Sequence, residues 1–310
     1  MTILRLIRYK NLLLIAFMQL IFRYGFLKLQ NIDLALTNWQ FGLLVLATVL
    51  IAASGYIIND ILDQETDTIN RPDTVLIGKK FSEDFAFNLY IVINISALLI
   101  GYYLSNVINK PTFLAAFIIP VVLLYLYATS FKKIAIIGNL IVAMVLGMSV
   151  MMIGFFDILP ATDEYNKGEM LTLAFILLDY AIFAVIVNFI REVVKDVEDI
   201  DGDYNQGMKT LPILIGKDRT LKIISILSAT STITLVVYVN ENLMNSKLYF
   251  ATIYCLLFVI SPMLFVTVKS WTAKSSKEFR LLSSVLKMVI FFGILSALVI
   301  TLNIKYNVKG

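Results

Sequence analysis

Acidic residues gather in two segments of this chain, and both segments repeat one spacing. Within "NDILDQETD" the spacing D-x-x-D-x-x-x-D is formed by Asp60, Asp63 and Asp67. Within "REVVKDVEDIDGD" the same spacing is formed by Asp196, Asp199 and Asp203. The stretches 59–73 and 191–203 together hold eleven of the 22 acidic residues. Such a concentration of like charge in an apolar chain requires a stabilising partner.

Divalent cations are the partners that this pattern indicates. Offsets of three and seven residues fall within roughly 60° on a helix, so each trio is predicted to line one helix face. Carboxylates on one face repel each other unless a cation lies between them. Magnesium pairs one or two carboxylates with substrate phosphates. A solvated acidic loop is the alternative for either segment alone, whereas a calcium hand starting at Asp199 fails, because Tyr204 and Thr210 replace its glycine and glutamate.

The elements that must position these acids are predicted to be membrane helices. Of the 310 residues, 59% are hydrophobic and 15% are charged, and the mean hydropathy is +0.84. A soluble domain has roughly 25% charged residues. Runs of about twenty apolar residues can cross a bilayer as helices. Nine spans are predicted, near 11–29, 41–62, 86–107, 113–128, 136–156, 171–190, 221–239, 248–268 and 284–304.

The distribution of basic residues predicts the orientation of these spans. With nine spans, seventeen of the 26 lysines and arginines lie on the side of the N-terminus and seven on the other, with Lys222 and Lys287 at span starts. Positive charge concentrates on the cytoplasmic side of membrane proteins. We therefore expect a multi-pass cell-membrane protein whose N-terminus and two acidic segments are cytoplasmic.

Composition excludes several classes of site. The chain has no histidine, which removes histidine-based zinc sites, histidine-ligated haem and any serine–histidine triad. The single cysteine, Cys255, lies in an apolar run and is expected to be a packing residue. No basic stripe interleaved with aromatic residues indicates nucleic acid, and nothing in the sequence implies an obligate protein partner.

A weak internal repeat accompanies the two acidic segments. "VLIGKK" follows the first segment and "ILIGKD" follows the second. We expect one membrane domain covering residues 1–310, built from two related halves, roughly 1–135 and 136–310. Each half would deliver one set of carboxylates.

These motifs resemble those of the UbiA-type intramembrane prenyltransferases over essentially the whole chain. The similarity includes "NDILDQETD", the later "DIDGD" followed by "GMKTLP", and nine spans with motifs after the second and sixth. The resemblance implies an all-α bundle with a central cavity that opens to the lipid. It also implies that a polyprenyl diphosphate binds there through Mg²⁺ and passes its prenyl group to a membrane-borne acceptor.

The resemblance assigns roles to particular residues. The implied metal ligands are Asp60, Asp63, Asp67, Asp196, Asp199 and Asp203. The implied diphosphate-binding residues are Asn59, Arg71, Lys132, Lys195, Arg8, Asn11 and Arg191. Catalytic roles are implied for Asp63, Asp67, Asp199, Asp203, Lys132 and Tyr127, where a tyrosine ring would stabilise an allylic cation. Tyr125 is another candidate ring, Asn139 belongs to the fifth-span signature, and Asn188 is a further polar candidate within the sixth span.

One departure and three alternatives accompany this assignment. Family members commonly continue from Arg-Pro to a second basic residue and Pro-Ser-Gly, whereas this chain reads "RPDTVLIGKK", so Lys79 or Lys80 would have to substitute. The second motif resembles geranylgeranylglycerol-phosphate geranylgeranyltransferases, which implies geranylgeranyl diphosphate as donor and geranylgeranylglyceryl phosphate as acceptor, in ether-lipid synthesis. An aromatic acceptor of the menaquinone or ubiquinone type is an alternative, and so is a non-catalytic relative. A cation-coupled transporter is the alternative of another class, although transporter sites usually lie near the bilayer midplane.

Overall fold

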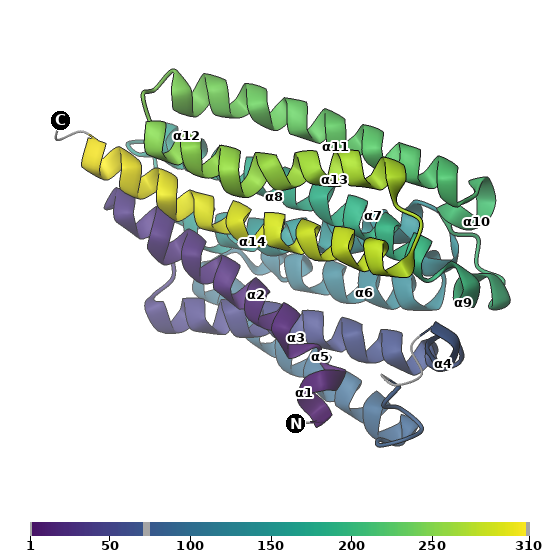
Figure 1. The fold of residues 1–310 in the computed structure, drawn as a ribbon. Helices are drawn as coiled ribbons and strands as arrows, with labels where there is room; N and C mark the ends of the chain where they lie inside the picture. The colour runs from purple at the N-terminus through teal and green to yellow at the C-terminus, as the bar shows by residue number, and fades with distance from the viewer. Residues whose placement is uncertain (1, 71–74, 308–310) are drawn as a thin grey trace.

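A computed structural model describes residues 2–70 and 75–307 of the chain. Over these residues the fold is all-helical, with two isolated β-bridges, between Ile77 and Phe81 and between Ile134 and Lys209. The long helices run roughly side by side in one bundle (Figure 1). The prediction of an all-α fold is confirmed.

Nine helical stretches in the described residues are long and apolar enough to cross a membrane. Their bounds are Tyr9–Gln30, Asn38–Leu62, Glu83–Val107, Pro111–Thr129, Ile137–Ala161, Lys167–Glu198, Lys217–Met244, Tyr249–Thr272 and Ser276–Asn307. Each overlaps one predicted span, and most extend a few residues further at both ends. Large apolar side chains on their outer faces are exposed, as bilayer-facing side chains should be; examples are Leu99, Phe175 and Val268.

Four of these spans are built from one α-helix each. These are α3 (Asn38–Leu62), α5 (Glu83–Val107), α8 (Lys167–Glu198) and α14 (Ser276–Asn307). Local capping begins two of them. The Thr37 hydroxyl accepts a hydrogen bond from the Gln40 amide while the Gln40 side chain accepts one from Thr37 N–H, and Ser82 accepts one from Phe85 N–H.

The remaining spans join an α-helix to a tighter or wider turn. Their α-helices are α2 (Tyr9–Leu20), α6 (Ala115–Thr129), α7 (Ile137–Ile153), α11 (Lys217–Val239), α12 (Tyr249–Cys255) and α13 (Ser261–Thr272). Wider π-helical turns occur at Ile21–Phe26, Gly154–Ile158, Asn240–Met244 and Leu256–Ile260. Such turns are rare and are frequent at functional sites. Cys255 is buried in this apolar packing, as expected for a packing residue.

Short helices lie at the ends of the bundle. They are α1 (Thr2–Leu6), α4 (Gln64–Asn70), α9 (Ile200–Asn205) and α10 (Leu211–Ile215). Helix α4 packs against α9, and both lie at the same end of the bundle, at the right in Figure 1. The two acidic segments, more than a hundred residues apart in sequence, therefore meet in space.

The prediction of one continuous helix face for each acidic trio is wrong in one respect. Helix α3 ends at Leu62 and α4 begins at Gln64, so Asp63 is a non-helical junction with φ −102° and ψ 11°. In the same way α8 ends at Glu198 and α9 begins at Ile200, with Asp199 at φ −93° and ψ 7°. In both trios the chain therefore leaves the helix at the middle aspartate.

The phrases that follow the two acidic segments also share a backbone feature. Gly78 of "VLIGKK" has φ +78°, and Gly216 of "ILIGKD" has φ +88°. Glycine adopts such angles without the steric cost that a Cβ would impose. This local likeness accords with the internal repeat, although the division into two halves stays a prediction.

Candidate active site

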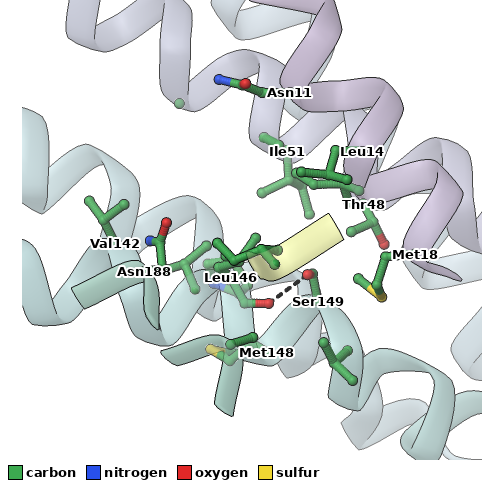
Figure 2. A pocket seen from close by; sticks show the side chains of 18 of the residues that line it. Asn11, Leu14, Met18, Thr48, Ile51, Val142, Leu146, Met148, Ser149 and Asn188 are labelled. Carbon is green, nitrogen blue, oxygen red and sulfur yellow. Dashed lines mark hydrogen bonds between the residues drawn. The ribbon is translucent and has the colours of Figure 1, made fainter. Parts of the chain in front are cut away.

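A cavity of about 230 Å³ lies inside the bundle, between α2, α3, α6, α7, α8 and α14. One face of each helix lines it at helical spacing, for example Thr48, Ile51, Gly55 and Asn59 on α3. From Thr48 to Asn59 the helix advances about 16 Å, at roughly 1.5 Å per residue. Figure 2 shows Leu14, Met18 and Ile51 on the N-terminal helices facing Val142, Leu146 and Met148. The cavity is therefore long and predominantly apolar.

Most polar side chains of the cavity gather near one end. Ten of them belong to this group: Arg8, Asn11, Tyr56, Asn59, Tyr127, Asn188, Arg191, Glu192, Lys195 and Lys287. Thr48, Ser149 and Tyr180 line other parts of the cavity. On α8, Asn188, Arg191, Glu192 and Lys195 share one face, since they are spaced by three, four and seven residues. We call this end of the cavity, defined by these ten residues, the mouth. It lies at the end of the bundle that carries the two acidic segments.

Two basic side chains, one at the mouth and one beside it, pair with carboxylates of the first acidic segment. The Arg8 guanidinium donates to Asp60 at 2.8 Å, and the Lys132 ammonium pairs with Asp63. Lys132 and Asp63 are both largely buried, with side-chain exposures of 8% and 14%. The sequence predicted these four residues as site residues, and the fold pairs them across 52 and 69 residues of the chain.

Arg8 has an unusual backbone conformation at the mouth. Its φ of 50° and ψ of 51° lie in the left-handed region, which few residues other than glycine adopt. The guanidinium lies 4.9 Å from the centre of the Tyr56 ring. Burial opposes its positive charge, but Asp60 and Tyr56 outweigh burial and raise the pKa of Arg8 above its ordinary value. Arg8 therefore stays charged, and such backbone strain is common at functional sites.

The loop that carries Lys132 is held tightly on both sides. A Cβ at Gly138 would lie 2.9 Å from Cα of Lys132 and 2.9 Å from O of Phe131, so only glycine lets α7 approach this loop so closely. On the other side, Lys209 N–H donates to Lys133 O at 2.9 Å. Since Lys209 follows the second acidic segment, this contact connects the Lys132 loop to that segment.

Side chains of the second acidic segment are also engaged. Asn139 donates to Asp196 at 2.8 Å, which links the fifth-span signature to the second trio. Glu192 accepts hydrogen bonds from Arg191 at 3.1 Å and from Lys195 at 2.6 Å. Both predicted phosphate-binding residues of α8 therefore already face a carboxylate.

Three residues of the mouth were missed by sequence reasoning: Tyr56, Glu192 as the partner of Arg191 and Lys195, and Lys287. The spacing of Glu192 from Asn188 and Lys195 on one helix face was a usable signal. Lys287 is a lone charge in a long apolar run, which by itself marks a functional candidate. Tyr56 had no signal of its own, because a single tyrosine in a membrane span is common.

The remaining predicted site residues lie in several different places. Arg71 lies outside the described residues. Tyr125 is 45% exposed on the outside of the bundle, so its proposed role beside the cavity is wrong. Tyr127 and Asn11 both line the cavity, and Asn11 donates to the Tyr56 hydroxyl at 3.2 Å. Asp67, Asp199 and Asp203 all take part in interactions of their own.

The donor atoms at the mouth are the type that a hard divalent cation requires. Within residues 2–70 and 75–307, no three acidic side chains come close enough to hold a metal ion by themselves. Asn59 Oδ1 is buried, and in the same residues it has no hydrogen-bond donor. Magnesium needs only one or two protein carboxylates when substrate phosphates complete its shell. Asn59, beside Asp60 and Asp63, thus contributes an unused acceptor oxygen where such an ion would lie.

Comparison with known proteins identifies relatives along most of the chain. The chain is 29% identical over 238 residues to digeranylgeranylglyceryl phosphate synthase of Methanobrevibacter smithii, which covers 76% of this chain and 80% of that protein. It is 36% identical over 192 residues to the protein of the same name from Thermococcus sibiricus, covering 62% of each. The match thus spans 80% of the first relative's length and 62% of the second's.

Solved structures show the same fold. A solved digeranylgeranylglyceryl phosphate synthase superposes with a TM-score of 0.62 at 25% identity, covering 96% of this chain and 98% of the other. A UbiA homologue from Archaeoglobus fulgidus, bound to GPP and Mg²⁺, superposes with a TM-score of 0.60 at 16% identity, covering 96% and 99%. The profile of the UbiA prenyltransferase family matches residues 25–302. The chain therefore belongs to the UbiA prenyltransferase family and is a multi-pass membrane enzyme that transfers prenyl groups.

Proposed function

We propose that this enzyme transfers the geranylgeranyl group of geranylgeranyl diphosphate to geranylgeranylglyceryl phosphate, with Mg²⁺ bound to its aspartates. The observation that carries the proposal is a single cavity with a charged mouth and an apolar interior. Beside its mouth the carboxylates of Asp60 and Asp63 pair with the cations of Arg8 and Lys132, and its interior is predominantly apolar. A long isoprenoid diphosphate has the same two parts.

Aspartates from both acidic segments would hold the metal. Asp60, Asp63 and Asp67 lie on one side, and Asp196, Asp199 and Asp203 on the other, because α4 packs against α9. Bound there, Mg²⁺ would supply a Lewis acid that offsets the negative charge on the departing diphosphate. Lys132 now neutralises Asp63, and it is positioned to bind a diphosphate oxygen once that carboxylate binds an ion instead. Arg8 and Lys195 would provide further donors to the diphosphate oxygens.

The reaction breaks the allylic C–O bond, and the bonding electron pair leaves with the diphosphate. The acceptor hydroxyl oxygen then forms the new C–O bond to the allylic carbon and loses its proton. An apolar cavity excludes the water that would otherwise capture the allylic cation. Tyr127, which lines this cavity, is a candidate to stabilise that cation through its ring. Because the chain has no histidine, the proton must pass to a carboxylate, a diphosphate oxygen or water.

The acceptor is proposed from the relatives, which are named digeranylgeranylglyceryl phosphate synthases in Methanobrevibacter smithii and Thermococcus sibiricus. An aromatic acceptor remains the alternative that the experiment must separate. A cytoplasmic mouth is proposed from the excess of basic residues on the side of the N-terminus. It is the face where a soluble diphosphate product would be released.

A transfer assay tests this proposal directly. Membranes containing the protein receive radiolabelled geranylgeranyl diphosphate and geranylgeranylglyceryl phosphate, with Mg²⁺ or with excess chelator. Metal-dependent formation of a labelled ether lipid, abolished by Asp63→Ala and by Asp199→Ala, is the expected result. Transfer to a benzoate or naphthoate acceptor, with no lipid product, would overturn the acceptor and keep the mechanism. Labelling of neither acceptor would overturn the proposed reaction.

A further inference from the structure

We propose that Lys287 binds the phosphate of the acceptor, at a subsite separate from the metal-bound diphosphate of the donor. This inference rests on the proposed function, because it concerns the acceptor of that reaction. It names a residue that distinguishes a phosphate-bearing lipid acceptor from an uncharged aromatic one. Lys287 lies on α14 and lines the mouth of the cavity.

Among the described residues, no carboxylate forms an ion pair with Lys287. Its ammonium donates to Asn11 Oδ1 at 2.7 Å, and among the residues that the structure describes it has no acidic side chain within ion-pair distance. The other cations of the mouth differ. Arg8 pairs with Asp60, while Arg191 and Lys195 share Glu192.

A lysine inside a membrane protein without a counter-ion is costly, so an anion is expected to occupy this position in the working enzyme. The neighbouring charges strengthen this expectation. Arg191 and Lys10 both act electrostatically on Lys287, and both are positive. In addition, the Nε of Arg191 is buried and has no acceptor in residues 2–70 and 75–307. A second anion between these groups would satisfy both side chains.

The position of Lys287 separates this anion from the donor diphosphate. The carboxylates and Lys132 lie where α3, the loop before α7 and the second acidic segment meet. Lys287 instead donates to Asn11 on α2, and Arg191 of α8 acts electrostatically on it. Two anions therefore fit at one mouth, one with metal-binding carboxylates and one with cations alone. A phosphate monoester suits the second position, because lysine binds phosphate as a compact charge without a metal.

Kinetics with two acceptors test the assignment. Lys287→Met removes the charge and keeps much of the side-chain length, Lys287→Arg restores the charge, and Lys277→Met is a matched control at an exposed position on the same helix. We expect Lys287→Met to raise KM for geranylgeranylglyceryl phosphate by about tenfold to a hundredfold, as for a lost charged hydrogen bond. KM for geranylgeranyl diphosphate should change less than threefold, by roughly the scatter of a neutral substitution.

The same assay is repeated with geranylgeranylglycerol, the acceptor without its phosphate. The wild type and Lys287→Met should use it equally, whereas Lys287→Arg should recover most of the affinity for the phosphorylated acceptor. A rise in KM for the diphosphate donor, with none for the acceptor, would assign Lys287 to the donor and overturn the inference. An equal loss with both acceptors would mean that Lys287 only supports the packing of α14, which also overturns it.

A wild-type measurement keeps the inference testable if Lys287→Met does not fold. Glycerol phosphate should inhibit the wild type competitively against the phosphorylated acceptor and not against the donor, and the reverse pattern would overturn the assignment. Failure of the proposed function is recognised separately, in the wild type, as the absence of lipid product from geranylgeranylglyceryl phosphate. Failure of this inference is recognised when that product forms and Lys287→Met leaves its KM unchanged.

Discussion

Two groups of charges lie inside this membrane bundle, one toward each end, and they are built differently. Toward the end away from the acidic segments, Arg23 pairs with Asp157, and their side chains are 1% and 0% exposed. Asp157 also accepts from Leu36 N–H at 3.1 Å, while Arg23 donates to Leu36 O and lies 4.4 Å from the centre of the Phe41 ring. Both charges of this pair are enclosed by protein.

The pairs beside the mouth are more open. The Arg8 and Asp60 side chains are 38% and 18% exposed, and the two side chains of the Lys132–Asp63 pair keep some exposure beside the cavity. In the described residues there, Asn59 Oδ1 accepts no hydrogen bond, and the Lys287 ammonium is bonded to the amide of Asn11 and not to a carboxylate. An enclosed pair connects helices, whereas an open pair can exchange its partner for a ligand. Residues of the first kind should govern stability, and residues of the second kind should govern activity.

Asp157→Ala is the change with the largest expected effect on the enclosed pair. It leaves Arg23 charged and unpaired, and removal of one partner of a buried pair costs about 3–5 kcal/mol. We expect a large loss of folded protein, measured by thermal unfolding in detergent, while the folded remainder keeps its KM for donor. The double variant Arg23→Met with Asp157→Leu should recover stability, because it leaves no unpaired charge. Normal stability in Asp157→Ala alone would contradict this interpretation.

Asp63→Asn tests the open group, where activity should fall while stability does not. Loss of one group that stabilises developing charge costs roughly a hundredfold to a thousandfold in kcat. The thermal unfolding temperature should stay within a few degrees of the wild type, because the amide oxygen of asparagine can still accept a hydrogen bond from Lys132. Asp218→Asn, an exposed acid in the first turn of α11, is the control. Equal activity in the variant and the wild type would mean that Asp63 is not part of the working site.

Gly138→Ala would move the Lys132 loop without changing any charge. The added methyl group would lie 2.9 Å from the backbone of Lys132, so the loop or α7 must shift. A shift of that kind displaces Lys132 from Asp63, and we expect kcat/KM to fall by roughly tenfold, since misplacement by about 1 Å costs up to a hundredfold. Gly168→Ala, where a Cβ meets no atom within 4 Å, is the matched control. A similar loss in both variants would contradict a role specific to the Lys132 loop.

Arg8→Lys is expected to have the smallest effect. Lysine keeps the positive charge beside Asp60 but loses the planar contact with the Tyr56 ring and the forked donors of arginine. We expect KM for the donor to rise by less than about tenfold, in line with one cation–π contact of about 0.5–2 kcal/mol. A transfer assay at varied donor concentration measures it. A loss as large as that of Asp63→Asn would show that Arg8 acts in more than positioning.

Much of the site could be predicted from the sequence, because the acidic residues stand out against an apolar background. Asp60, Asp63 and Asp196 lie beside the basic or amide side chains with which the fold pairs them, and Lys132 and Asn139 were already candidates. The junction at Asp63 could not be predicted, because helical periodicity continues through it. Lys287 and the Arg23–Asp157 pair were not predicted either, since their partners are distant in sequence.

By itself the sequence determined the nine spans, the all-helical class and the two carboxylate sets, since apolar run length and residue spacing are local properties. Only the tertiary structure decided which charges are neutralised. Asp157 and Lys287 are each a single charge in an apolar run, yet one is enclosed by Arg23 and the other faces the cavity with an amide as its partner. The physical reason is that the environment of a charge in a membrane bundle depends on helices far away in the chain, whose packing no local pattern records.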